Sequence, residues 1–171
     1  MKTVDAKQVI DQLGLAYFHE LSTFGALSDK AIVALLNQGE ITQWKKGETE
    51  DVSTPALSDF YVVLQGDIAY YRHCEDHDVL TRHFRSGEQM AFDVMISMRP
   101  NAGIEVASED SLVLTISSDQ FFQFHVDFPS DFGLLMINLS RELSREIAML
   151  EQVIGDSTGW VSEDKGSEAE L

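Results

Sequence analysis

The sequence predicts a mainly β domain of the α+β type, a sandwich or barrel of short strands with helices on either side. Between residues 41 and 116, short apolar or alternating segments recur every ~8–12 residues and are separated by turn residues. Before and after this region, the apolar residues recur at helical spacing instead. With 171 residues, 44% of them hydrophobic, the chain is long enough to bury one core, so we expect a single domain.

Residues 5–21 are predicted to form the first helix. Asp5 and Gln8 resemble a capping box at its start, and apolar side chains recur along one face. Gly14 weakens this prediction, because glycine destabilises a helix interior. We describe residues 1–21 as an N-terminal helical extension, which packs either on its own domain or on a second chain.

The main domain is expected to span residues 22–128 and to begin with a second helix. Ser28 caps this helix and Gly39 ends it. The clearest strands lie in FYVVLQGDIAYY, where Gly66 marks a bulge or tight bend. The other expected elements are a polar hairpin loop, HCEDHD (residues 73–78), and strands in residues 79–84, AGIEVA and SLVLTIS.

Helical spacing returns after the last strand. A helix that begins at Ser118 is followed by a longer one over residues 129–154, and the acidic tail, residues 155–171, is predicted to be disordered. The apolar stripe of the long helix is broad, which favours a homodimer. Packing of the stripe against the β-domain or the N-terminal helix is the alternative. The residues assigned to a dimer interface are Met136, Leu139, Leu143, Ile147 and Leu150.

The charge of the chain argues against nucleic acid as a direct partner. Twelve Lys and Arg stand against 29 Asp and Glu, a net charge of −17, and no basic cluster exceeds the pair at 45–46. A duplex-binding protein needs a basic surface to displace counterions. No apolar segment is long enough to span a membrane, and the N-terminus lacks the apolar core of a signal peptide. We therefore expect a cytoplasmic protein without membrane contact, and the single cysteine, Cys74, excludes an internal disulfide.

Several spaced features carry a family resemblance: Gly47-Glu48, Tyr61 with Leu64 and Gly66, Gly87-Glu88 and the region of Ala102. Their order resembles the cyclic nucleotide-binding domain, the effector domain of catabolite activator-type (Crp/Fnr-type) regulators and of kinase regulatory subunits. The resemblance covers residues 22–152. It implies an eight-stranded, jelly-roll-like β-roll flanked by N-terminal helices and a long C-terminal helix. The segment TEDV departs from the family, in which this strand is usually apolar.

The family holds its ligand through a cassette similar to F-G-E-x-A-L, followed by R-x-A. By this resemblance Phe92 stands in place of the ribose-binding Glu and Asn101 in place of the phosphate-binding Arg. Each lost charge-assisted hydrogen bond is worth roughly 1.5–3 kcal/mol, so cyclic nucleotide is a disfavoured ligand and no cofactor is expected. Ala91 replaces a glycine and tolerates a positive φ less well. The implied pocket residues are Gly87, Glu88, Met90, Ala91, Phe92, Val94, Met95, Arg99, Asn101 and Ala102.

Two fates of this pocket stay open. In the first, apolar side chains collapse into it as a plug. In the second, it holds a ligand with an apolar body and one anionic group. Arg99 then replaces the missing arginine, although Pro100 stiffens the backbone between the two positions, and Arg82 and Arg85 are further anion partners. The side chains expected to form the plug are Met90, Phe92, Val94, Met95 and Met98.

No motif indicates an enzyme or a metal site. The loop HCEDHD contains metal-ligand residue types, but a hairpin tip is mobile and a solvated turn is the simpler interpretation. His83 and His125 lie beside aromatic residues and are interpreted as packed or surface histidines. The sequence has neither a nucleophile elbow nor a phosphate loop. Transcription regulators of the family carry a helix-turn-helix domain after the long helix, whereas only residues 155–171 follow it here, so no direct DNA reading is expected.

These observations predict a stand-alone regulatory or adaptor module with a degenerate cassette. We expect a homodimer that acts through contacts with an unidentified protein. The alternative is a small-molecule sensor that binds a cyclic nucleotide, or another anionic or apolar ligand, in the roll.

Overall fold

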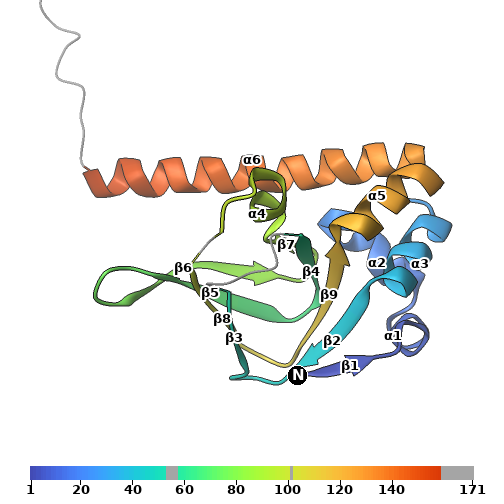
Figure 1. The fold of residues 1–171 in the computed structure, drawn as a ribbon, viewed down its shortest axis with the longest axis horizontal. Helices are drawn as coiled ribbons and strands as arrows, with labels where there is room; N and C mark the ends of the chain where they lie inside the picture. The colour runs from blue at the N-terminus through green and yellow to red at the C-terminus, as the bar shows by residue number, and fades with distance from the viewer. Residues whose placement is uncertain (53–57, 101, 159–171) are drawn as a thin grey trace, which may run out of the picture.

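The computed structural model describes residues 1–52, 58–100 and 102–158, which form two antiparallel sheets and a set of helices (Figure 1). The first sheet has the strand order β1 (Lys2–Val4), β2 (Glu40–Trp44), β9 (Ser111–Ser117), β4 (Asp59–Gln65) and β7 (Gln89–Met90). The second has the order β3 (Thr49–Asp51), β8 (Gly103–Ala107), β5 (Asp67–His73) and β6 (Asp78–Arg85). The predicted mainly β fold with flanking helices is confirmed: β2 to β9 are the eight strands of the roll, and β1 is an additional edge strand.

Alternate residues of a strand face opposite sides of a sheet, so the first sheet packs on two cores. One face, together with the helices, forms the helix-side core; the other faces the second sheet and forms the roll interior. Strand β4 contributes Phe60, Val62 and Leu64 to the first and Tyr61 and Val63 to the second. The buried residues that define the roll interior are Trp44, Val63, Ile68, Phe84, Met90, Ala107 and Val113.

The N-terminal segment forms two short helices, α1 (Ala6–Leu13) and α2 (Leu15–Glu20), so the prediction of one helix over residues 5–21 is wrong. Gly14 adopts φ +78°, which turns the backbone out of the helix. The cap is as predicted, since the Asp5 carboxylate accepts a hydrogen bond from the Gln8 N–H. Strand β1 was not predicted, and its pairing with β2 places this segment on its own domain.

Two predicted helix boundaries are confirmed. Helix α3 (Asp29–Gln38) begins after Ser28, whose hydroxyl accepts from the Ala31 N–H, and ends at Gly39. Between α2 and α3 lies a single 3-10 turn, η1 (Ser22–Phe24). Helix α5 (Ser118–Asp127) begins one residue after its cap, Ser117, which forms a full capping box with Gln120. In the roll itself, α4 (Phe92–Ser97) follows β7 directly.

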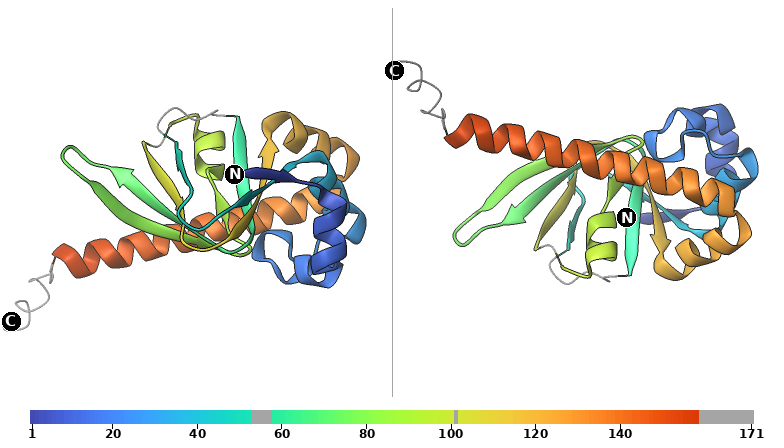
Figure 2. Two further views of the ribbon diagram at one scale, coloured as in Figure 1. Left: turned by 90° about the horizontal axis from the view of Figure 1, so that it is seen from below. Right: turned by 90° about the horizontal axis from the view of Figure 1, so that it is seen from above.

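The last helix, α6 (Pro129–Thr158), runs along the length of the molecule (Figure 1) and continues past the predicted end at residue 154. Helices α1, α2, α3 and α5 lie at the same end of the molecule as the start of α6 (Figure 2), whereas the β5–β6 hairpin projects at the opposite end. The buried Asn138 amide donates to the carbonyls of Thr23 and Gly25 at 3.2 and 2.8 Å, which fixes α6 to η1. None of the helices in the described residues is long and apolar enough to cross a membrane.

Candidate functional site

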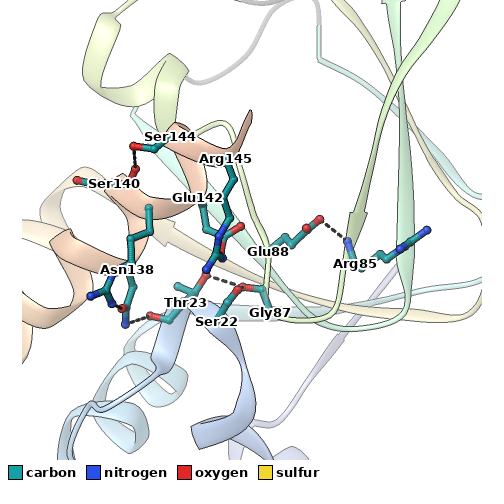
Figure 3. Close-up of polar contacts among 11 residues, drawn as sticks. Ser22, Thr23, Arg85, Gly87, Glu88, Asn138, Ser140, Glu142, Ser144 and Arg145 are labelled. Atoms are coloured by element: carbon teal, nitrogen blue, oxygen red, sulfur yellow. Dashed lines mark hydrogen bonds and ion pairs between the residues drawn. The ribbon is translucent and has the colours of Figure 1, made fainter. Parts of the chain in front are cut away.

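The Gly87-Glu88 turn is a structural junction between the roll and the helices. Gly87 adopts φ +93°, and a Cβ there would lie 2.8 Å from the Ser22 nitrogen, so only glycine fits. Its carbonyl accepts hydrogen bonds from the Ser22 and Thr23 hydroxyls, both at 2.7 Å (Figure 3). Glu88 accepts from the Arg85 N–H at 2.9 Å. These two pocket residues of the resemblance therefore hold a turn, through contacts that need no ligand.

The start of α4 keeps the tight turn of the cassette without its glycine. Ala91 adopts the left-handed conformation with φ +60°, so alanine tolerates the conformation that we expected it to threaten. The Phe92 N–H donates to the buried side chain of Gln89 at 3.0 Å. A buried phosphate needs free backbone N–H groups at such a helix start. The Phe92 N–H is one of these groups, and its hydrogen bond to Gln89 makes it unavailable to a phosphate.

Phe92 does not enter the roll interior. Its ring makes edge-on contacts with Phe60 and Phe121, at centroid distances of 5.4 and 5.9 Å, and it is buried in the helix-side core. Phe60 faces away from Tyr61 and Val63 on β4, so Phe92 lies on the opposite side of this strand from the pocket. The expectation that Phe92 plugs the pocket is wrong for this reason.

Of the other proposed plug residues, Met90 belongs to the roll interior. Val94 is buried, and Met95 packs in the helix-side core beside Phe92. Met98 is 65% exposed and fills nothing. Of the five proposed plug residues, Met90 belongs to the roll interior, whereas Phe92 and Met95 on α4 serve the helix-side core.

Replacing Phe92 with leucine is expected to lower the free energy of unfolding by about 1–2 kcal/mol, because the edge-on ring contacts are lost while most of the volume stays. Urea denaturation measures the change. Phe122→Leu is the matched control, since Phe122 is 66% exposed on α5 and should change stability by less than ~0.5 kcal/mol. Equal effects at the two positions would contradict the assignment of Phe92 to the core.

Arg99 does not replace the missing phosphate anchor in this structure. It is exposed, and its backbone N–H donates to the Ser97 hydroxyl at 3.3 Å. Ala102 is also exposed, and its carbonyl accepts a hydrogen bond from the Tyr70 hydroxyl at 3.2 Å. Asn101 lies outside the described residues. The described part of the cassette therefore directs no guanidinium into the roll.

The roll interior contains a feature that sequence reasoning missed, a buried carboxyl. Glu105 is only 6% exposed and lies on the same face of β8 as Gly103 and Ala107, both of which are buried. Its cross-strand neighbours are Glu50 on β3 and Tyr70 on β5. The alternation of GIEVA carried the signal, because its buried face includes position 105. The polar segment TEDV, noted as a departure from the family, supplies the second carboxyl.

The ionisation of these groups is strongly perturbed. Burial, followed by repulsion from Glu50, raises the pKa of Glu105 to about 7. Burial also raises the pKa of Glu50. The pKa of Tyr61 is raised to about 12, by burial first and then by Glu50, Glu105 and Asp59. Tyr61 and Tyr70 both pack against the roll interior. Because Glu50 and Glu105 lie beside them, this region is acidic, whereas a bound phosphate would require positive charge.

Arg82 and Arg85, the other proposed anion partners, lie in a separate groove between β6 and α6. This cavity of about 670 Å³ is lined by both signs of charge. Arg82 forms an ion pair with Glu146 and stacks over the ring of Phe84, and Arg145 pairs with the buried Glu142 at 2.5 Å (Figure 3). The Arg82–Glu146 pair joins β6 to α6, whereas the Arg145–Glu142 pair lies within α6. The two glutamates place negative charge beside the arginines of this groove, which disfavours an anionic ligand.

The β5–β6 hairpin loop is a polar turn, as predicted. The Cys74 N–H donates to the His77 carbonyl at 2.9 Å, and His73 pairs with Asp78 at 2.6 Å. Across the described ranges, no group of three or more His, Cys, Asp or Glu side chains is arranged to hold a metal ion.

The apolar stripe of α6 divides into two parts. Leu139 is fully buried in the helix-side core, and Met136 and Leu143 pack partly against it. Ile147 and Leu150 are 58% and 46% exposed. Leu139 is therefore a core residue of its own chain and not available to a partner in this packing. The exposed apolar residues in the second half of the helix are Ile147, Met149, Leu150, Val153 and Ile154.

No known family model matches the sequence, and no curated protein matches it in sequence. Solved structures match its fold over most of its length. A cyclic nucleotide-binding domain from Methylobacillus flagellatus KT superposes with a TM-score of 0.76 at 15% identity, over 92% of this chain and 89% of that one. The chain has the cyclic nucleotide-binding domain fold.

Two regulators share this fold. The sensor domain of the transcriptional regulator DNR from Pseudomonas aeruginosa has a TM-score of 0.61 at 19% identity, over 83% of this chain and 94% of that one. The catabolite activator protein of Thermus thermophilus has a TM-score of 0.63 at 17% identity, over 78% of this chain and 61% of that one. Within the cyclic nucleotide-binding fold, β7 and α4 are the elements that the cassette resemblance maps to, and the acidic roll interior lies beside them.

Proposed function

We propose that this chain is a cyclic nucleotide-binding-like regulatory module that has lost cyclic nucleotide binding and acts through protein–protein contacts. The observation that carries the proposal is the buried carboxyl of Glu105 in the roll interior, opposite Glu50. A phosphate monoanion there meets like charge, and Arg99 is exposed instead of turned inward. The Phe92 N–H is already bonded to Gln89, which removes one further donor.

The loss of both polar anchors should weaken binding by about two to four orders of magnitude. Isothermal titration calorimetry of the wild-type protein with cAMP and cGMP is therefore expected to show no binding tighter than ~0.1 mM. Circular dichroism on the same sample establishes that the protein is folded. Micromolar binding of either nucleotide would overturn the proposal.

The protein contacts are assigned to α6. Its first half is fixed to the domain by Leu139 and Asn138, whereas its second half exposes a row of apolar side chains. A contiguous apolar patch of this kind is a feature of protein–protein contact sites. A homodimer through this half of the helix, with a further protein as the regulated partner, is the assembly that we propose.

The alternative function, a sensor of an anionic ligand, has less support. Its three proposed arginines do not converge: Arg99 is exposed beyond α4, and Arg82 and Arg85 lie in the groove beside α6. The net charge of −17 also opposes the approach of an anion and of nucleic acid. No catalytic activity is part of the proposal.

A further inference from the structure

The groove between β6 and α6 is a cavity of about 670 Å³ to which no role has been assigned. Its volume falls in the range of ligand pockets, roughly 300–1,000 Å³. On the β6 side it is lined by residues 80–83, four in succession, and then by Arg85. Because neighbouring side chains of a strand point to opposite faces, a cavity lined by successive residues runs along the edge of the strand.

This edge of β6 is free. Among the described strands, β6 pairs only with β5, so its other side presents N–H and C=O groups that no strand uses. At Arg85 both groups are taken by Glu88, whose carboxylate accepts from the Arg85 N–H and whose N–H donates to the Arg85 carbonyl, each at 2.9 Å (Figure 3). Groups that face outward recur at every second residue of an antiparallel strand, so those of His83 point to the same side, along the groove.

The groove also contains a buried hydrogen-bond donor. The Arg82 side chain is nine-tenths buried, and its Nη1 is the one buried side-chain nitrogen or oxygen of the described residues without a hydrogen bond. The contact of this atom with Glu146 pairs the two charges, but it does not have the geometry of a hydrogen bond. Buried polar atoms nearly always have a partner, so this nitrogen is suited to an acceptor that enters the groove.

The charges around this donor favour an occupant without net charge. The groove is lined by three arginines and three glutamates: Arg82, Arg85, Arg145, Glu88, Glu142 and Glu146. A peptide backbone presents neutral donors and acceptors in the alternation that a strand edge requires, whereas a strongly charged ligand of either sign would meet like charges. Leu80 and Met149 also line the groove, and both are 45% exposed, so they offer contacts to an apolar side chain.

We propose that this groove binds an extended peptide segment of another protein, which joins the free edge of β6 as a further strand. The segment pairs with the backbone of His83, and one of its carbonyls accepts a hydrogen bond from Arg82 Nη1. An aliphatic side chain of the segment packs against Leu80 and Met149. The inference rests on the proposed function and deepens it, because it gives the regulated partner a site and a conformation.

The peptide and the proposed homodimer use different faces of α6. Glu146 and Met149 line the groove, whereas Ile147 and Leu150 were assigned to contacts between chains. Each of the second pair follows one of the first by a single residue, which is about 100° around the helix. A dimer through Ile147 and Leu150 therefore leaves the groove accessible to the peptide.

The test measures the fluorescence polarisation of a labelled peptide of alternating threonine and valine as the full chain is added. A length of about eight residues is enough to span residues 80–83 at ~3.3 Å per residue. The matched probe is the same peptide with methyl groups on two successive backbone nitrogens, which block both of its edges. We expect saturable binding of the first peptide and at least ~10-fold weaker binding of the second, because it cannot form the hydrogen bonds of a strand ladder.

Two pairs of variants locate the site. Leu80 and Val79 are both exposed on β6, at 45% and 37%, but Leu80 lines the groove and Val79 does not. Leu80→Asp should weaken binding of the unmethylated peptide at least ~10-fold, and Val79→Asp should bind it like the wild type. Arg82→Gln with Glu146→Gln removes the buried donor without leaving an unpaired charge, and it should also weaken binding ~10-fold. Circular dichroism shows whether each variant is folded.

An absence of saturable binding at ~1 mM peptide, or equal binding of the methylated peptide, would overturn the inference. Equal losses in Leu80→Asp and Val79→Asp would do so as well. A wild-type dimer that Leu80→Asp dissociates and Ile147→Asp with Leu150→Asp leaves intact would also overturn it, because the edge would then pair with a second copy of this chain. The calorimetry with cAMP and cGMP decides the loss of nucleotide binding independently of these results.

Discussion

Replacing Glu105 with glutamine is expected to raise the free energy of unfolding by about 3 kcal/mol at pH 8 and to change it little at pH 4. The pKa of Glu105 is raised from 4.5 to about 7 in the folded protein, because its carboxyl is buried opposite Glu50. One pKa unit corresponds to about 1.4 kcal/mol between the two protonation states. Glutamine has nearly the shape of the protonated acid and carries no charge, so it removes this penalty.

The pH window follows from the direction of the pKa change. Below the unfolded pKa of 4.5, Glu105 is protonated in both states, and the folded protein carries no penalty. As the pH rises, the unfolded chain releases this proton first, so stability is lost progressively until the pH exceeds the folded pKa of about 7. Above that pH the difference between wild type and variant should stay constant.

Urea denaturation of the wild type and Glu105→Gln at several pH values between 4 and 8.5 measures this difference. Subtracting the two curves cancels the titration of carboxylates that do not interact with position 105, so the difference reports Glu105 together with its coupling to Glu50. Glu109→Gln should give a difference that is small at every pH, because Glu109 is exposed. A variant that is less stable than the wild type at pH 8 would mean that the Glu105 carboxylate has a stabilising partner.

The elements that the sequence predicts correctly are those set by local chemistry. Ser28 and Gly39 delimit α3 because a hydroxyl cap and a glycine stop act within one helical turn. SLVLTIS matches β9 residue for residue, since its alternation directs Leu112 and Leu114 to one core and Val113 to the other. Structure that depends on contacts between residues close in sequence can be predicted from one segment alone.

The errors concern contacts between distant segments. Phe92 was assigned to the pocket from its place in a cassette, but its direction is decided by Phe121, which lies on α5 and packs against its ring. Strand β1 forms only because β2 offers a free edge, and three residues carry too short a pattern to reveal it. Gly14 was recognised as a weak point, yet only its φ of +78° shows that the helix breaks there.

The acidic pair was missed for a related reason. Glu50 and Glu105 are 55 positions apart, and each alone reads as an ordinary polar residue of a strand. Their meeting depends on the register of β3 against β8, which the sequence does not specify. The burial of Glu105 further requires the first sheet to close over it. The family resemblance located the pocket region, but it could not supply the charge that this chain places there.

The double variant Ile147→Asp with Leu150→Asp is expected to convert a wild-type dimer into a folded monomer. These two residues lie three apart on α6, so they share one face of the helix, and both are about half exposed in the single chain. Burying such a side chain contributes roughly 1.5–3 kcal/mol, and a symmetric interface contains each residue twice. With four apolar side chains replaced by carboxylates, the dimer dissociation constant should rise more than ~1000-fold.

Size-exclusion chromatography with light scattering gives the oligomeric state, and circular dichroism shows that the fold is kept. The fold should survive, because neither residue belongs to the helix-side core or the roll interior. Leu143 is unsuitable for this test, since it packs against the helix-side core and its replacement would destabilise the monomer as well.

The matched control is Phe122→Asp with Val126→Asp on α5, where both side chains are as exposed, at 66% and 57%. It adds the same charge to another apolar surface, so it should leave the dimer intact. Leu139→Ala should have the opposite pattern of effects, because Leu139 is buried in its own chain. It should lower the free energy of unfolding of each chain by about 2–5 kcal/mol and leave the exposed surface of α6 unchanged. A monomeric wild type, or dimers that persist in Ile147→Asp with Leu150→Asp, would mean that the exposed half of α6 is not the interface between chains.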